Sequence, residues 1–215
     1  MQTTFRHVAL TLALTTASMA TTSLAIAQAP PDAPGAQPAD PAARFAEAQS
    51  LFDKGSFAEA LAKFQPLAEE TKSPNVLLYV ARSLRELGRT TEAYDAMQVA
   101  VRVSTERAVA EEKYAQTRDA ASAELAILAL KISHVVVAVA DAPDGAVVKL
   151  DGTALTAAQV GSSITVMPGE HAVELEVPGA STVKRSVTVA AGESKTLALA
   201  AGQARESPPP PPKDE

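Results

Sequence analysis

The pattern of apolar positions along the 215-residue chain changes in kind near residue 132. Before that point, over residues 42–131, apolar residues recur every three to four positions, which predicts amphipathic helices. The pattern repeats after 33 residues, and each copy is interrupted by a glycine, Gly55 or Gly88. A period of this length predicts two helix–turn–helix repeats. A further helix over residues 109–130 is expected to cap the array, with its charged residues, Glu124 among them, forming a solvated face.

Over residues 132–200 short runs of alternating or β-branched residues are separated by turn-forming pairs such as Asp151-Gly152. We expect strands near residues 134–139, 146–150, 163–166, 171–177, 183–189 and 195–199. In the 171–177 run we expect the alanine, the valines and the leucine on the packed face of the strand and His171 on the solvent-exposed face. The sequence therefore predicts an α+β multidomain protein, a short all-α helical solenoid followed by a small antiparallel β-sandwich.

The two ends of the chain differ from the rest in composition. Residues 8–20 are mostly apolar, broken by Thr15, Thr16 and Ser18, and precede the small residues Ala25 and Ala27, so residues 1–27 are predicted to be a cleaved signal peptide. Residues 28–41 are rich in proline and alanine, and residues 201–215 include five consecutive prolines, so both are expected to be disordered. We expect an exported protein of the periplasm or cell envelope, or a secreted one, without a transmembrane helix after cleavage.

The helical repeats resemble tetratricopeptide repeats at matching positions. The shared features are small residues where paired helices approach closely, a glycine in each turn and a proline, Pro74, between the repeats. The small residues are Ala48, Ala60, Ala81 and Ala93. The resemblance implies a positive φ at Gly55 and Gly88, and a groove lined by the first helix of each pair.

The groove positions that this resemblance implies are Gln49, Asp53, Arg82 and Arg85, which we take as candidate protein-binding residues. Arg82 and Arg85 are i, i+3 neighbours on one helix face, and two guanidinium groups there can clamp a carboxylate of a partner. The competing interpretation is that both arginines are solubilising surface charges.

Residues 135–199 resemble a PEGA domain. Three motifs carry the resemblance, in order: Pro143-Asp144-Gly145-Ala146, Val148-Lys149-Leu150-Asp151-Gly152 and Pro168-Gly169-Glu170-His171-Ala172-Val173. The resemblance implies a small β domain at residues 132–200. It also favours a turn-stabilising role for His171 over a catalytic one.

Composition argues against several function classes. The chain has no Cys and three His, which excludes thiol chemistry and a histidine-rich metal centre. Its net charge of −6, without a basic cluster, argues against a nucleic-acid partner. No nucleophile elbow, P-loop or dinucleotide fingerprint occurs. Asp141, Asp144 and Asp151 fit turn chemistry better than a calcium site. We therefore expect no enzyme, no catalytic residue, no cofactor and no metal.

Within the two predicted domains, aromatic residues are confined to the helical one. Seven of the eight lie between Phe45 and Tyr114, and the other is Phe5. Without aromatic rings, the β region is a weaker candidate for stacking against sugars.

We expect a non-enzymatic envelope adaptor that binds an unidentified envelope protein or peptide through its helical repeats. The PEGA-like domain would then be a spacer or a second docking module. The alternatives are a cell-wall or polysaccharide-binding protein acting through that domain, and an enzyme of unrecognised type.

Overall fold

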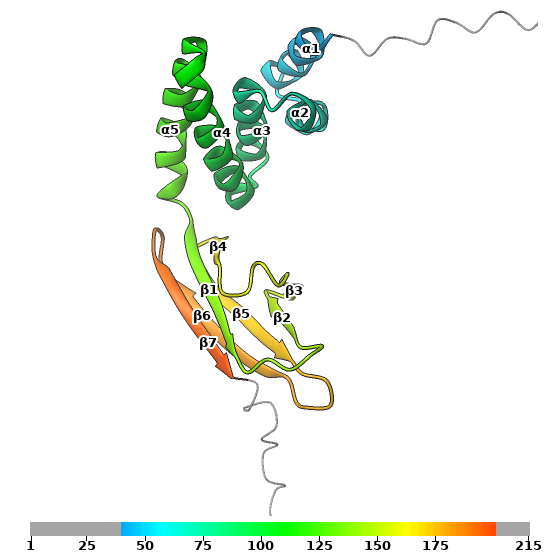
Figure 1. The fold of residues 1–215 in the computed structure, drawn as a ribbon, viewed down its shortest axis with the longest axis vertical. Helices are drawn as coiled ribbons and strands as arrows, with labels where there is room; N and C mark the ends of the chain where they lie inside the picture. Colours follow the sequence, from blue (N-terminus) through cyan, green and yellow to red (C-terminus); the bar gives the residue numbers. More distant parts are fainter. Residues whose placement is uncertain (1–39, 201–215) are drawn as a thin grey trace, which may run out of the picture. The chain divides into compact units, whose positions relative to one another are not determined.

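The computed structural model describes residues 40–200, in which helices are followed by strands in an α+β layout (Figure 1). The helices are α1 (Pro41–Asp53), α2 (Phe57–Thr71), α3 (Pro74–Glu86), α4 (Thr90–Ala110), the 3-10 helix η1 (Glu112–Tyr114) and α5 (Ala115–Ala129). The predicted signal peptide at 1–27, residues 28–39 of the predicted linker and the tail at 201–215 lie outside the described residues. Pro41, assigned to the linker from sequence, instead begins α1.

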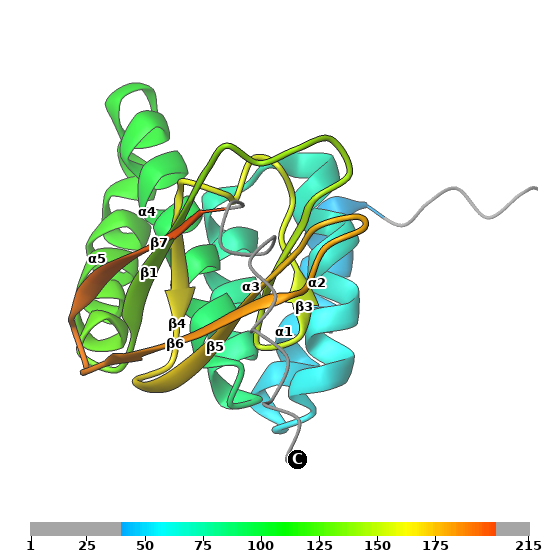
Figure 2. The same ribbon diagram turned by 90° about the horizontal axis from the view of Figure 1, so that it is seen from below.

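Each helix of this region packs against the next one along the chain (Figure 1 and Figure 2). In addition, α1 contacts α3 and α3 contacts α5. The odd-numbered helices therefore share one face, to which α1, α3 and α5 each contribute side chains.

Small residues allow the close packing of these helices. Ala48, Ala60, Ala81 and Ala93 are completely buried, as their predicted positions at helix contacts require. Gly55 and Gly88 have φ angles of 80° and 73°, so the predicted positive φ in both turns is confirmed. Pro74 is the first residue of α3, where its missing N–H leaves no helical hydrogen bond unmade.

An aromatic cluster forms the core between α1, α2 and α3. Phe64 is fully buried, and its ring stacks on that of Tyr79 with centroids 5.2 Å apart. Phe45 and Phe52 each meet Tyr79 edge-on, at 5.5 and 5.3 Å. Such offset and edge-on pairs add to the stabilisation from burial alone. A second cluster, around Met97, Ala100, Ala121 and Leu128, joins α3, α4 and α5.

The predicted third helix over residues 109–130 is wrong at its start. Val109 and Ala110 are the last residues of α4, and Glu111 is extended, with φ −135° and ψ 93°. The 3-10 turn follows, and α5 begins only at Ala115. The break contains neither glycine nor proline, the residues that usually mark a helix end in a sequence. The periodicity of apolar residues therefore predicted one continuous helix across it.

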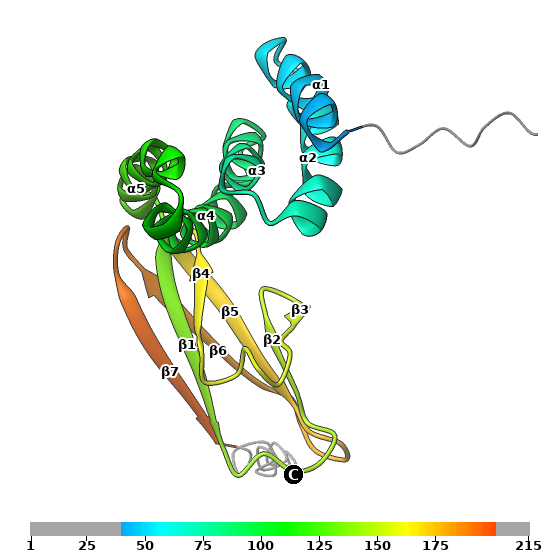
Figure 3. The same ribbon diagram turned by 45° about the horizontal axis from the view of Figure 1, so that its top comes forward.

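The strands of the described chain form two sheets (Figure 3). They are β1 (Ser133–Ala140), β2 (Val147–Leu150), β3 (Thr153–Ala154), β4 (Ser163–Val166), β5 (Gly169–Glu176), β6 (Val183–Val189) and β7 (Ser194–Ala200). One sheet has the order β4-β1-β7 and the other β3-β2-β5-β6. The two-residue strand β3 was not predicted, because it is too short to show alternation.

The expectation that all strands pair antiparallel is wrong for one pair. Strands β1 and β7 run parallel, in register from His134 opposite Ser194 to Ala140 opposite Ala200. The other four pairings are antiparallel. Turn signals report the direction between strands that follow one another along the chain. They carry no information about the first and the last strand, which are the two that pair here.

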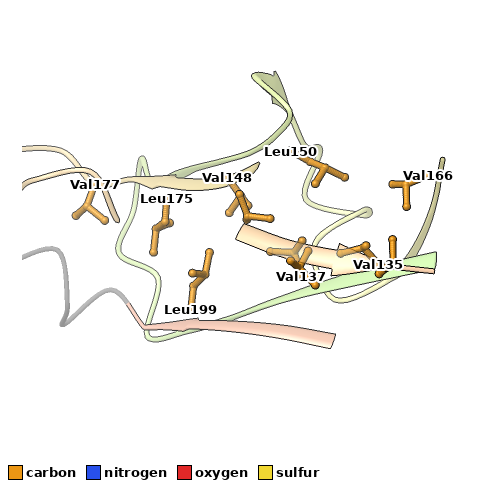
Figure 4. Close-up of a cluster of buried hydrophobic side chains, with 11 residues drawn as sticks. Val135, Val137, Val148, Leu150, Val166, Leu175, Val177 and Leu199 are labelled. Atoms are coloured by element: carbon orange, nitrogen blue, oxygen red, sulfur yellow. The ribbon is translucent and has the colours of Figure 1, made fainter. Parts of the chain in front are cut away.

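Valine and leucine side chains from both sheets form the core of the β region (Figure 4). Val135, Val137, Val173 and Leu175 are completely buried. His171 shares the buried face of β5 with Val173 and Leu175, whereas Ala172 is exposed. The faces predicted for His171 and Ala172 were therefore wrong, because a strand places residues i, i+2 and i+4 on one face whatever their polarity.

Candidate functional site

The face shared by α1, α3 and α5 is hollowed at two adjoining places, of about 500 and 330 Å³. The larger hollow is lined by Phe52, Asp53, Gly55, Phe57, Arg82, Arg85, Glu86 and Glu124. The smaller is lined by Phe45, Gln49, Asn75, Leu78, Tyr79, Arg82, Lys113, Gln116, Thr117 and Ala120. Arg82 belongs to both, so the two hollows form one continuous surface, which we call the groove.

All four candidate residues chosen from the sequence line this groove. Asp53 and Arg85 lie in the larger hollow, Gln49 in the smaller, and Arg82 in both. Helical geometry explains the grouping, because residues three or four apart share one face of a helix. Gln49 and Asp53 of α1 and Arg82 and Arg85 of α3 are spaced in this way.

Arg82 and Arg85 converge on one carboxylate, that of Glu124 in α5. The Nε and Nη2 atoms of Arg82 donate to Oε1, with Nε at 2.9 Å. Nη1 of Arg85 donates to Oε2 at 2.7 Å. The side chain of Glu124 is only 18% exposed. The two guanidinium groups therefore do clamp a carboxylate, as the sequence suggested, but in the described residues it belongs to the same chain.

Glu124 is the groove residue that sequence reasoning missed. Its interpretation as part of a solvated face is wrong, because it is mostly buried against two arginines. The available signal was weak: Glu124 lies three residues after Ala121 and four before Leu128, both on the buried face of α5. A charged residue on such a face needs a partner. Its partners lie about forty positions away in the sequence, so a local sequence pattern does not identify them.

Other polar contacts fix the remaining groove side chains. The amide of Gln49 donates to the Tyr79 hydroxyl at 2.7 Å, and the Arg82 guanidinium lies 5.4 Å from the centre of the Tyr79 ring. Thr117 donates to the side-chain oxygen of Asn75 at 2.5 Å. Asp53 is exposed and pairs with no cation among residues 40–200. Its carboxylate is therefore available to a ligand.

The charges of the larger hollow do not balance. Three carboxylates, Asp53, Glu86 and Glu124, face two guanidinium groups, which leaves one negative charge in surplus. Arg85 also donates to Glu86 through Nε at 3.0 Å. A carboxylate from a ligand would have to displace Glu124 or Glu86, whereas a cation would meet Asp53 directly. The rings of Phe52 and Phe57, 5.1 Å apart, add apolar surface to the same hollow.

A second charged contact lies in the β region. Nδ1 of His171 lies 2.7 Å from a carboxylate oxygen of Asp151, and Nε2 lies 2.7 Å from the backbone carbonyl of Met167. Both partners accept hydrogen bonds, so only the protonated ring, the imidazolium, donates from both nitrogens at once. Burial lowers the pKa of His171, but the hydrogen bonds to Asp151 and Met167, with the charge of Asp151, outweigh it and raise the pKa overall.

This contact ties a hairpin turn to the neighbouring strand. Asp151 and Gly152 both have positive φ, 49° and 80°, as a tight two-residue hairpin requires. The other carboxylate oxygen of Asp151 accepts the backbone N–H of Ala172 at 2.9 Å. With both ring nitrogens of His171 engaged, neither is free to take a proton from a substrate.

Within residues 40–200, no three or more His, Asp or Glu side chains are grouped so as to hold a metal ion. The same part of the chain contains no helix that is both long and apolar enough to cross a membrane.

Comparison with known proteins adds no assignment. No model of a protein family matches the chain, and no curated protein matches it either.

Proposed function

We propose that the protein is a non-enzymatic adaptor of the cell envelope that binds a segment of another protein in the groove. In this proposal the helices form a short solenoid of tetratricopeptide type, and the strands form a PEGA-like sandwich that acts as a spacer or second docking module. One observation carries the proposal: residues chosen from the sequence as groove positions line one continuous hollowed surface. The envelope location rests on the signal-like residues 1–27.

The chemistry of the larger hollow favours a particular kind of segment. Its surplus negative charge and the exposed Asp53 favour a lysine or arginine, and Phe52 and Phe57 favour an adjacent apolar side chain. Arg82 and Arg85 then act mainly by holding Glu124 in place, which keeps the hollow open and shaped. The partner is thus a protein or peptide with a basic residue beside an apolar one.

The proposal assigns the β region a supporting role. Its core is aliphatic, and it holds no aromatic ring on which a sugar could stack. The most buried ionisable side chain described there, His171, is engaged at both nitrogens. These features suit a rigid module better than a polysaccharide-binding site.

A charge reversal in the groove tests this function. Asp53→Lys places a cation where the partner's cation is expected. Because Asp53 pairs with no cation in the described chain, the substitution breaks no ion pair there. Glu59→Lys is the matched control, since Glu59 is also an exposed acid but lies outside both hollows. Crosslinking in cells followed by mass spectrometry should recover a partner with the wild type and with the control. With Asp53→Lys the amount of partner recovered should be at least tenfold lower.

Equal recovery with both variants would contradict the groove proposal. Sedimentation of the protein with purified peptidoglycan distinguishes the alternative: retention unaffected by Asp53→Lys would favour a cell-wall-binding role through the β region.

A further inference from the structure

Four aromatic rings lie in one row along the groove. Phe45, Tyr79, Phe52 and Phe57 follow one another, with successive ring centroids 5.5, 5.3 and 5.1 Å apart. Phe45 and Tyr79 line the smaller hollow, and Phe52 and Phe57 line the larger one. All four residues are half-buried, so each ring contributes both to the core and to the surface of the groove. The row is therefore at most about 16 Å long.

A row of rings of this length fits a short run of prolines. The polyproline II conformation has a rise of about 3.1 Å per residue, so five prolines span about 15 Å. Grooves lined by aromatic side chains bind such segments, because the conformation is formed before binding and little entropy is lost. The chain contains five consecutive prolines at residues 208–212, beyond the part that the structure describes. Its own sequence thus supplies a ligand of matching length.

The charge at one end of the row matches the residue that follows the prolines. Asp53 lines the larger hollow together with Phe57, is exposed, and pairs with no cation among residues 40–200. Lys213 directly follows the proline run. When the last proline lies near Phe57, the ammonium group of Lys213 is placed at the Asp53 carboxylate. Charge complementarity therefore selects both the segment and its direction in the groove.

The two acids after Lys213 agree with this direction. Asp214 and Glu215 come next in the sequence, where the segment leaves the row of rings. Lys54 directly follows Asp53, is exposed and forms no ion pair with any described residue. The order of acid then base at the end of α1 thus complements the order of base then acid in the segment. Such exposed pairs add little affinity, but they disfavour the opposite direction.

The length of the connection decides which copy supplies the segment. Strand β7 runs parallel to β1, and its last residue, Ala200, lies opposite Ala140, at the end of β1 remote from α5. Residues 201–207 join Ala200 to the prolines and span at most about 24 Å. That is about the length of the eight-residue strand β1, so a tail of the same chain is used up in returning to the level of Ser133. A tail from another copy has no such limit.

We propose that residues 208–213 of one copy bind in the groove of a second copy, with the prolines on the row of rings and Lys213 at Asp53. This inference rests on the proposed function, because the tail occupies the same groove and competes with the partner for it. A contact of six residues is much smaller than the roughly 800 Å² per partner of a stable interface. The association is therefore weak, with a dissociation constant of about 0.1 mM.

Sedimentation equilibrium of the purified full chain over a range of concentrations tests the proposal. The wild type should self-associate, and Asp53→Lys and Lys213→Glu should each raise the dissociation constant at least tenfold, because each places like charges together. Glu59→Lys changes an exposed acid outside both hollows and should associate like the wild type. A wild type that stays monomeric up to about 1 mM, or an equal loss with this control, would overturn the proposal.

Mixing the two variants tests whether the segment and the groove come from different copies. Asp53→Lys keeps an intact tail and Lys213→Glu keeps an intact groove, so an equimolar mixture should form a complex that neither variant forms alone. A mixture no more associated than its components would overturn the proposal. Alanine at residues 208–212, with Lys213 kept, should also abolish the association, and its persistence would overturn the contact with the rings.

Crosslinking in cells, which tests the proposed function, separates the two proposals. If a partner is recovered in a manner that depends on Asp53 while the purified protein stays monomeric, the tail inference fails and the adaptor function stands. If the protein self-associates through Lys213 but no partner is recovered, the adaptor function fails and the tail is the occupant of the groove.

Discussion

Glu124 in the helical region and Asp151 in the β region are both held by positively charged side chains from another element, but the two arrangements differ in the space around them. Glu124 lies beside an open hollow of about 500 Å³, and its partners Arg82 and Arg85 remain 24% and 37% exposed. In the β region the side chain of His171 is only 10% exposed, and both its nitrogens are engaged. The same kind of contact therefore shapes an open groove in one region and fixes a turn in the other.

The two cores differ as well. The helical core contains stacked rings, with Phe64 and Tyr79 at its centre, whereas the β core consists of valine and leucine. The tyrosine fluorescence and near-UV circular dichroism signals consequently come from rings of the helical region, since the chain has no tryptophan and residues 132–200 contain no tyrosine. The two regions can be followed separately in one sample.

The largest predicted effect comes from emptying the aromatic core. Phe64→Ala should lower the free energy of unfolding of the helical region by about 3–5 kcal/mol, because the side chain is fully buried and leaves a large cavity. Urea denaturation followed by tyrosine fluorescence measures it. Val173→Ala in the β core is the counterpart and should leave the tyrosine transition in place. If both variants shift it equally, the regions unfold as one unit and the comparison fails.

A smaller effect is expected from the groove carboxylate. Glu124→Ala leaves the guanidinium group of Arg82 without a counter-charge, whereas Arg85 keeps its contact with Glu86, and should cost about 2 kcal/mol, measured by the same tyrosine transition. Glu106→Ala removes an exposed acid paired with Arg102 on α4 and should cost less than about 0.5 kcal/mol. Equal costs would mean that Glu124 is an ordinary surface charge, as the sequence first suggested.

The smallest effect concerns pH and the β region. The pKa of His171 is raised in the folded state, so its stabilising contribution is complete below its unfolded pKa of about 6.5. It is lost as the pH rises through the higher folded pKa. Hydrogen exchange in β5 should therefore show about 1 kcal/mol less protection at pH 8.5 than at pH 6, after correction for intrinsic exchange rates. His171→Gln should abolish this difference; its persistence would assign the pH dependence to another group.

Local features of the fold were predictable from the sequence. Gly55 and Gly88 marked the helical turns because only glycine adopts a positive φ there without strain. The strand over Val183–Val189 was predicted with its observed bounds, since valines interleaved with polar residues between two turn signals are typical of a half-buried strand.

The features that sequence reasoning missed depend on distant contacts. The parallel pairing of β1 with β7 joins the two ends of the β region, and the contact of Glu124 with Arg82 spans forty-two positions. His171 was assigned to the solvent-exposed face because it is polar, although the two-residue period of β5 places it on the buried face. The groove positions were those implied by the resemblance to tetratricopeptide repeats, but the carboxylate that Arg82 and Arg85 hold became evident only once α5 was placed beside α3.

The most direct test of the account asks which surface of the helical region meets a partner. A photoreactive phenylalanine is introduced in cells at Phe57, which lines the larger hollow, or at its neighbour Ala58, which is exposed and lines neither hollow. After illumination, we predict a protein adduct from position 57 and none from position 58. Adducts from both positions alike, or from position 58 alone, would contradict the claim that the groove is the binding surface.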